Sequence, residues 1–159
     1  CLPMLRESHG RIINISSISG LVALPGVSVY ASSKFAVEAI SDSLRVELFP
    51  FGIRVVAIEP GSIDTEIWRK GADRDQNNSA AADADLRRLY APLQGLLEKL
   101  NRDPRGIPPV SVAEVVARAL AAAEPEHRYL VGADARSLAL LRYLPDGLRD
   151  RLVRKKVWR

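Results

Sequence analysis

Two short apolar runs joined by one long amphipathic stretch constrain the fold of this chain more than any other feature. The runs cover residues 11–15 and 53–58, and each is bounded by glycine, serine or proline. Between them, over residues 29–49, apolar side chains such as Val29 and Ile40 recur at spacings of three, four and seven, which is the period of a helix, and Glu38 belongs to the polar remainder. A strand, a helix and a second strand of this kind predict a βαβ unit with parallel strands buried on both faces.

The next part of the chain is predicted to be helical. Leucines on one stripe indicate a helix over residues 83–100, with Asp83 as its cap and Pro92 as a kink. Ser111 and Glu114 have the spacing of a capping box, which predicts that a further helix begins there.

The last part of the chain returns to a strand and two helices. Residues 129–131 form a short apolar run that predicts the last strand, and Pro145 and Gly147 divide residues 133–159 into two short helices. We therefore expect an α/β fold, a doubly wound parallel sheet of the Rossmann type, in a single domain over residues 1–159.

Composition excludes several classes of protein. Of the 159 residues, 47% are hydrophobic and 26% are charged, which is typical of a globular domain and not of a disordered chain. Cys1 is the only cysteine, so no disulfide forms within the chain, and a reducing compartment such as the cytoplasm is expected. One cysteine and two histidines are too few for a structural zinc site, and we expect no metal.

Tyr30 and Lys34 are candidates for acid–base chemistry because residues four apart on a helix share a face. A free tyrosine is nearly all protonated at neutral pH. An ammonium at ~4 Å favours the ionised phenol by about 4 kcal/mol at an effective dielectric near ~20. Tyr30 can then exchange a proton with an alcohol or a carbonyl. Taken alone, the pair is a weak signal, because a tyrosine and a lysine at this spacing occur on the solvated face of many helices.

Small hydroxyl residues and glycine follow both predicted strands. Ser16 and Ser17 come just after the first strand, and Pro60-Gly61 ends the second. Open parallel sheets bind their ligands beyond the carboxyl ends of the strands. A serine there can donate a hydrogen bond to a developing alkoxide. The alternative is a serine- and glycine-rich loop chosen only for its turn.

Three segments, in this order, resemble the short-chain dehydrogenase/reductase family. GRIINISSISG is similar to its fifth strand and serine loop, YASSK to its YxxxK motif, and IRVVAIEPGSIDT to its sixth strand and Pro-Gly turn. The resemblance implies that Ser17 holds the substrate oxygen and that Tyr30 is the catalytic acid/base. It also implies that Lys34 assists the tyrosine and binds the nicotinamide ribose.

The resemblance extends to the cofactor. It implies that the turn of Pro60, Gly61, Ile63 and Thr65 lines the nicotinamide of NAD or NADP, with the backbone of Ile63 contacting the carboxamide. Glu59, just before this turn, is expected to be structural or to accept a hydrogen bond behind the site.

The family's glycine-rich loop, its cofactor-selecting residue and its NNAG segment do not occur in this sequence. We expect them upstream of Cys1, so that the chain is the C-terminal part of an N-terminally truncated domain, with about 100 residues missing at roughly 30 per βα unit. The isolated fragment is then expected to be inactive. The parent protein is expected to interconvert an alcohol and a carbonyl with NAD or NADP, and to form a homo-oligomer through the helix at residues 29–49. The sequence leaves the choice of cofactor and the direction of the reaction open.

The nature of the substrate also follows from resemblance. The segment from Tyr30 to Leu48, together with RYLVG near the C-terminus, is similar to retinol and hydroxysteroid dehydrogenases. This similarity implies an apolar substrate resembling a retinoid, a steroid or a lipid. The leucine-rich residues 86–100 are then a substrate lid, or else ordinary core packing.

Three other functions compete with this interpretation. A serine hydrolase is disfavoured, because no GxSxG motif surrounds Ser17 or Ser19. A non-catalytic module is an alternative, because residues 138–158 alternate leucines with arginines and could bind a membrane surface or a partner, or else pack on the sheet. A family member that has lost catalysis is the third. Nucleic acid is not expected, because the basic charge is local and few aromatic residues accompany it.

Overall fold

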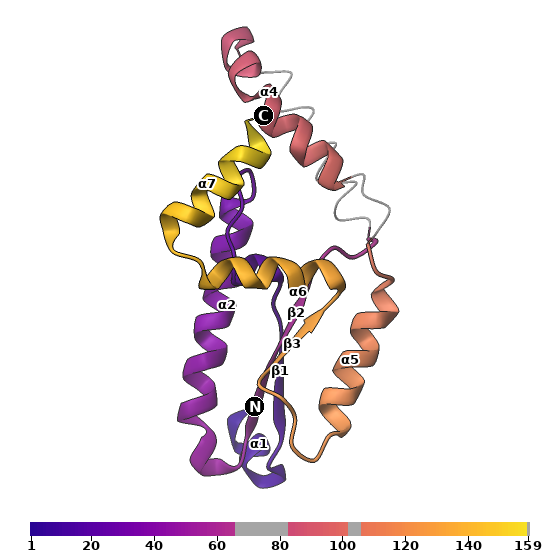
Figure 1. Ribbon diagram of the computed structural model, residues 1–159. Coiled ribbons are helices and arrows are strands. Elements are labelled where there is room, and N and C mark those ends of the chain that lie inside the picture. Colours follow the sequence, from indigo (N-terminus) through magenta and orange to yellow (C-terminus); the bar gives the residue numbers. More distant parts are fainter. Residues whose placement is uncertain (66–82, 102–105, 159) are drawn as a thin grey trace.

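The computed structural model describes residues 1–65, 83–101 and 106–158. At its centre is a parallel sheet, as the sequence predicted, with three strands in the order β1-β2-β3 (Figure 1). The strands are β1 (Arg11–Ile15), β2 (Arg54–Pro60) and β3 (Arg128–Val131). β1 pairs with β2 from Arg11 opposite Arg54 to Ile15 opposite Ile58, and β2 pairs with β3 from Ala57 opposite Arg128 to Pro60 opposite Val131.

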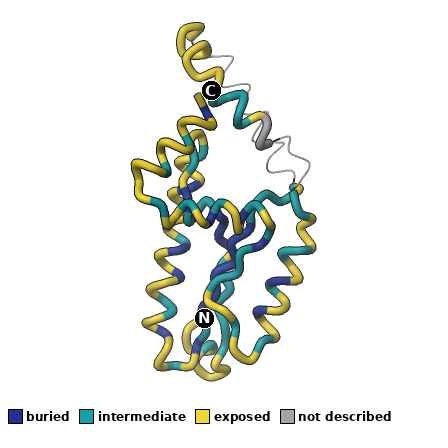
Figure 2. Tube along the Cα trace, viewed as in Figure 1, coloured by how far each residue is buried: buried dark blue, intermediate teal, exposed yellow. Residues whose placement is uncertain are grey.

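Strand β2 has both faces covered, and its side chains alternate between two helices. Val56 and Ile58 pack with Val115 and Ala119 of α5 (Pro109–Ala121). The intervening residues face the opposite side, where α2 (Ser28–Glu47) lies (Figure 1). Every residue of β2 after Arg54 is buried (Figure 2). This arrangement explains why the strand is a continuous apolar run and not an alternating one.

The remaining elements surround this α/β core. They are α1 (Leu2–Ser8), η1 (Ile18–Gly20), η2 (Phe49–Phe51), α4 (Ala84–Asn101), α6 (Ala133–Ala139), η3 (Leu140–Tyr143) and α7 (Asp146–Val157). As predicted, α4 begins directly after Asp83 and contains Pro92. None of the described helices combines the length and the apolar character that crossing a bilayer requires.

Two predicted helix boundaries are wrong. Helix α5 begins at Pro109, two residues before the proposed capping box, because the fixed φ of proline suits the first helical position. Ser111 therefore lies in the first turn, where its N–H donates to Pro108 O at 2.9 Å. Gly147 also lies inside a helix, in the first turn of α7, and the break before α7 falls at Pro145.

The predicted faces of α2 are partly wrong as well. Val29 and Ile40, counted in its apolar stripe, are exposed, whereas Glu38, counted in its polar remainder, is only 5% exposed. The periodicity was ambiguous because α2 carries apolar residues on its outer face and buried polar residues toward the sheet (Figure 2). Burial of Glu38 is possible because Arg128 of β3 pairs with it.

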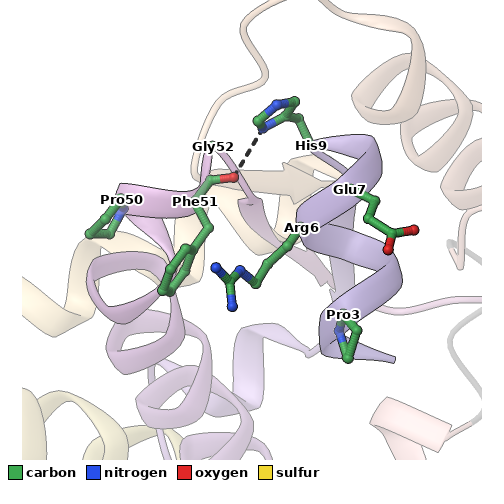
Figure 3. A pocket seen from close by; sticks show the side chains of 7 residues that line it. All are labelled: Pro3, Arg6, Glu7, His9, Pro50, Phe51 and Gly52. Atoms are coloured by element: carbon green, nitrogen blue, oxygen red, sulfur yellow. Dashed lines mark hydrogen bonds between the residues drawn. The ribbon is translucent and has the colours of Figure 1, made fainter.

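A hollow of about 540 Å³ opens at the amino end of the sheet, between α1 and η2 (Figure 3). Arg6 stacks over the Phe51 ring at 4.4 Å, and the Nδ1 atom of His9 forms a hydrogen bond with Phe51 O at 3.1 Å. His9 and Gly52 precede the first and second strands, so this hollow lies at the end of the sheet opposite to the serine loop.

Candidate active site

The serine loop follows the carboxyl end of β1 and contacts the carboxyl end of β2. The N–H of Ser16 donates to Ile58 O at 2.8 Å and so extends the ladder of the sheet by one residue. Ser17 is buried, and its Oγ accepts the N–H of Ser19 at 3.1 Å. The Ser17 hydroxyl donates only a long bond, 3.4 Å, to Pro60 O. Its oxygen is therefore fixed, while its proton can be directed to a better acceptor.

Gly20 lets this loop approach α2 closely. A Cβ atom at Gly20 would lie 2.9 Å from Lys34 O and 2.9 Å from the Oγ of Ser16. Because real side chains do not tolerate such distances to backbone, a glycine is required here. The serine loop is thus held against the turn of α2 that carries Lys34.

Lys34 links α2 to the end of the first strand. Its Nζ donates to Ile15 O at 3.1 Å and lies 5.7 Å from the centroid of the Tyr30 ring. Tyr30 is 41% exposed. The lysine therefore faces the serine loop, as the shared face of the two residues requires.

Backbone hydrogen bonds hold the Pro-Gly turn from several directions. The N–H of Gly61 donates to Val131 O at 2.9 Å, and the N–H of Ser62 donates to the Oδ2 of Asp134 at 2.6 Å. Ile63 forms an isolated parallel bridge with Ile107, whose N–H donates to Ser62 O at 3.0 Å. Ile107 O accepts the N–H of Asp64 at 3.0 Å.

This pattern determines where the backbone of Ile63 points. Along an extended chain, successive residues direct their N–H and C=O groups to opposite sides. Since Ser62 O and the N–H of Asp64 both bond to Ile107, the N–H and C=O of Ile63 point away from it. Neither group has a partner within residues 1–65, 83–101 and 106–158. The pair forms a donor and an acceptor that match an amide. Thr65, half-buried, is the last residue described before the gap.

Comparisons with known proteins agree with this fold. The family model for short chain dehydrogenases matches residues 1–76. Retinol dehydrogenase 16 of Mus musculus is 39% identical over 96% of this chain and 50% of its own length. The NADPH-dependent 3-dehydrocapnine reductase of Ornithobacterium rhinotracheale is 37% identical over 92% of this chain and 50% of its own length. The chain belongs to the short-chain dehydrogenase family.

Solved structures of short-chain dehydrogenases have the same fold. One from Streptomyces avermitilis superposes with a TM-score of 0.70 at 26% identity, over 99% of this chain and 55% of the other. A second, from Burkholderia cenocepacia in complex with NADP, has a TM-score of 0.62 at 28% identity, over 95% of this chain and 50% of the other. This chain spans about half the length of the curated relatives that it matches.

The structure also contains a cluster of ion pairs behind the site, which the sequence analysis did not predict. Arg128 of β3 pairs with Glu38 and, at 2.6 Å each, with Glu59 and Asp42. Glu59, expected to be structural or an acceptor, lies buried here with its Oε1 accepting from Arg128. The cluster connects α2 to β2 and β3, and its residues on α2 lie one and two turns after Lys34.

The carboxylates of this cluster differ in their electrostatic environment. Burial, together with the neighbouring Glu38, raises the pKa of Glu59 even though Arg128 opposes the shift. At Asp42, burial acts in the same direction, but the guanidinium groups of Arg45 and Arg128 outweigh it and lower the pKa. The more exposed carboxylate is therefore stabilised as an anion, and the buried one is not.

Asp134 is a second residue that the sequence analysis missed. It follows β3, in the first turn of α6, and contacts the Pro-Gly turn 72 residues earlier in the chain. The only signal in the sequence was its position two residues after Gly132, just beyond the last predicted strand.

Proposed function

We propose that this chain carries the catalytic residues of an NAD(P)-dependent oxidoreductase that interconverts an alcohol and a carbonyl. One observation carries the proposal: the Lys34 ammonium is bonded to Ile15 O beside the serine loop and lies next to Tyr30. Tyr30, Lys34 and Ser17 would then act as acid/base, cation and hydroxyl donor at the carboxyl end of the sheet, where open α/β folds bind ligands.

The residues also suit a nicotinamide. The free N–H and C=O of Ile63 match the acceptor and donor of a carboxamide, and Pro60, Gly61 and Thr65 would line the same turn. When bound, the nicotinamide supplies the hydride chemistry, and the protein contributes position and electrostatics. A relative crystallised with NADP and a relative named as NADPH-dependent support NADP(H), although the present residues do not select between NAD and NADP.

The proposed roles follow from the positions of the three side chains. In the direction of reduction, the Tyr30 hydroxyl gives its proton to the carbonyl oxygen, and Ser17 donates a hydrogen bond to the same oxygen. Lys34 stabilises the tyrosinate that results and would hold the ribose hydroxyls. In the direction of oxidation, the tyrosinate accepts the proton of the alcohol.

Tyr30→Phe in the natural full-length protein tests this proposal. General acid–base catalysis contributes about 10²- to 10⁴-fold, so we expect kcat to fall by about 10³-fold with little change in the cofactor KM. Tyr143→Phe is the matched control, because Tyr143 is 75% exposed and remote in sequence from the site. Turnover close to normal in the Tyr30 variant would refute the assignment.

We propose an apolar substrate of the retinoid, steroid or lipid class. Helix α4 supports this, because the Leu97 side chain occupies the space beside Gly26, in the loop that leads to Tyr30. The same helix exposes Leu86 and Leu89, at 50% and 64%. An apolar helix beside the loop that leads to Tyr30 suits a lid over a bulky ligand. Turnover of small polyols but not of retinol or a hydroxysteroid would contradict this proposal.

We also propose that the outer face of α2 joins two copies of the protein. Phe35, Ile40 and Val46 are 45%, 54% and 75% exposed on this helix, although each is apolar. Exposed apolar side chains on a single helix suit an interaction site. Ile40→Glu is expected to convert an oligomer to a monomer in sedimentation velocity, whereas Ser137→Glu, at an exposed serine of α6, is the control. A wild-type protein that sediments as a monomer would contradict the proposal.

A second candidate function is contact with an anionic membrane surface through α7. At 100° per residue, Leu148 and Leu152, each 45% exposed, lie between Arg151 and Lys155 on one side and Arg149 and Lys156 on the other. Each such cation contributes about 1 kcal/mol near an anionic bilayer. We expect co-sedimentation with phosphatidylserine vesicles that Leu152→Glu abolishes, and none with phosphatidylcholine vesicles. Equal binding to both vesicles, or to neither, would exclude this function.

A further inference from the structure

We infer that Asp134 is a positioning residue that sets the turn facing the nicotinamide, and that residue 61 is glycine because the Asp134 carboxylate occupies the space of a side chain there. The inference rests on the proposed function, since it assigns a role within the same site. It goes beyond that function because neither the motifs nor the proposed chemistry involves Asp134.

The position of Asp134 is determined by the end of β3. Gly132 has a φ of 110°, which only glycine adopts readily, and this conformation turns the chain from β3 into α6. Asp134 then falls in the first turn of α6, half-buried, with its carboxylate directed at the Pro-Gly turn. A Cβ atom at Gly132 would lie 2.5 Å from its Oδ1, so the carboxylate fills the space between the two glycines.

The contact with Gly61 is closer still. A Cβ atom at Gly61 would overlap both oxygens of Asp134, which are the nearest atoms to that site. Since the φ of Gly61 is not in the left-handed region, backbone conformation does not explain this glycine. The carboxylate does explain it: any larger residue at position 61 must push Asp134 away from Ser62.

Ser62 transmits this contact to Ile63. Its N–H donates to Asp134 at 2.6 Å, and its C=O accepts the N–H of Ile107 at 3.0 Å. A hydrogen bond to a carboxylate is about twice as strong as one between neutral groups. The N–H of Ser62 belongs to the peptide that comes from Gly61, and its C=O belongs to the peptide that leads to Ile63, so the two bonds fix two successive peptides. The N–H and C=O of Ile63, which have no partner among the described residues, are thereby preset for the carboxamide. Loss of the carboxylate leaves only the Ile107 side fixed.

A purely structural role predicts different measurements. An aspartate in the first turn of a helix also stabilises that helix through its dipole, and losing this effect lowers stability without affecting one ligand more than another. A positioning role affects the cofactor selectively, because only the nicotinamide contacts Ile63 in the proposed site. The ratio of the cofactor KM to the substrate KM therefore separates the two roles.

The experiment uses the natural full-length protein and steady-state kinetics with NADP(H) or NAD(H), whichever supports turnover. We expect Asp134→Ala to raise the cofactor KM about tenfold, the effect of one charge-assisted hydrogen bond, with the substrate KM within about twofold. Asp134→Asn keeps an acceptor oxygen and should recover most of the loss. Asp146→Ala, in the first turn of α7, is the control, since Asp146 is exposed and pairs only with Arg149 among the described residues.

Gly61→Ala gives an independent test. Its methyl group should expel the carboxylate and raise the cofactor KM as much as Asp134→Ala does. The double variant Gly61→Ala/Asp134→Ala should then be no worse than either single variant, because both remove the same bond. If Asp134→Ala does not fold, Asp134→Asn and Gly61→Ala still report on the contact.

Two results would overturn the inference: a cofactor KM within about twofold of wild type in Asp134→Ala, or effects of the two substitutions that multiply in the double variant. A wild-type protein without any nicotinamide-dependent turnover would instead refute the proposed function. Normal turnover with an unaltered cofactor KM in the variants would refute only the role of Asp134.

Discussion

The carboxyl end of the sheet and the ionic cluster behind it are built in different ways. At the sheet end, a backbone group takes part in each contact, whether its partner is another backbone group, as from Ser16 to Ile58, or a charged side chain, as from Lys34 to Ile15. In the cluster, charged side chains make them, and Arg128 reaches Glu38 across 90 residues of sequence. We infer that the sheet end carries the proposed chemistry and that the cluster holds α2 in the position that this chemistry requires.

The largest expected effect is on stability, from Arg128→Met. Removing one partner of a buried ion pair costs about 3–5 kcal/mol, because it leaves Glu59 and Glu38 as uncompensated buried charges. Urea unfolding at neutral pH measures the loss. Arg54→Met is the control, since its partner Glu124 is largely exposed and the pair is worth about 0–1 kcal/mol. Equal losses of unfolding free energy in the two variants would show that the buried cluster stabilises the fold no more than an exposed ion pair does.

The second effect is on catalysis, from Ser17→Ala in the natural full-length protein. Loss of one donor to a developing oxyanion costs about 10²- to 10³-fold in kcat. Stability should fall by only about 1 kcal/mol, because the hydroxyl also accepts the N–H of Ser19. Ser16→Ala is the matched control, because the Ser16 hydroxyl has no partner among the described residues. A drop in stability without a drop in kcat would show that Ser17 has a structural role and not a catalytic one.

The same contrast explains what could be predicted from the sequence. The strands at residues 11–15 and 54–60 were predicted within two residues, since apolar runs bounded by glycine and proline are local signals. The spacing of Tyr30 and Lys34 predicted that the two side chains share a face of the helix, but it did not specify that Lys34 reaches Ile15 O.

Contacts between distant segments could not be predicted in this way. Asp134 meets Ser62 across 72 residues, and nothing within the local sequence of either residue specifies the other. Glu38 looked like part of a solvated face, because helical periodicity counts a charged residue as exposed unless its partner is known. Its partner comes from a strand that is paired only in the folded sheet.

The third prediction concerns a neutral contact of the same helix. Ser41 is fully buried, and its Oγ accepts from the Nδ2 of Asn14 at 2.9 Å and donates to Val37 O at 2.7 Å. Ser41→Ala leaves the Asn14 donor without this acceptor, and we expect a loss of about 1–2 kcal/mol in the free energy of unfolding. Ser43→Ala, on the exposed face two residues on, should change it by less than about 0.5 kcal/mol. Indistinguishable variants would show that α2 is held by its charges alone.

The smallest expected effect is a change in how stability depends on pH, from Glu59→Gln. Burial raises the pKa of Glu59 above its usual 4.5, so the folded protein binds this proton more tightly than the unfolded chain does. The stabilisation from this group is complete below that value and is lost as the pH rises through the folded pKa. Asp42 has the opposite sign, because its pKa is lowered, and its contribution is lost only as the pH falls below about 3.8.

Urea unfolding between pH 4.5 and 8 therefore isolates the contribution of Glu59 from that of Asp42. Glu59→Gln should remove the fall in stability that Glu59 causes as the pH rises, while its amide oxygen still accepts from Arg128. Asp42→Asn is the control, since it should leave this part of the curve unchanged. If the stabilities of Glu59→Gln and of the wild type fall in parallel as the pH rises, Arg128 neutralises Glu59 completely. The cluster would then stabilise the protein without the cost of burying Glu59 beside Glu38, and in this respect it would not differ from the sheet end.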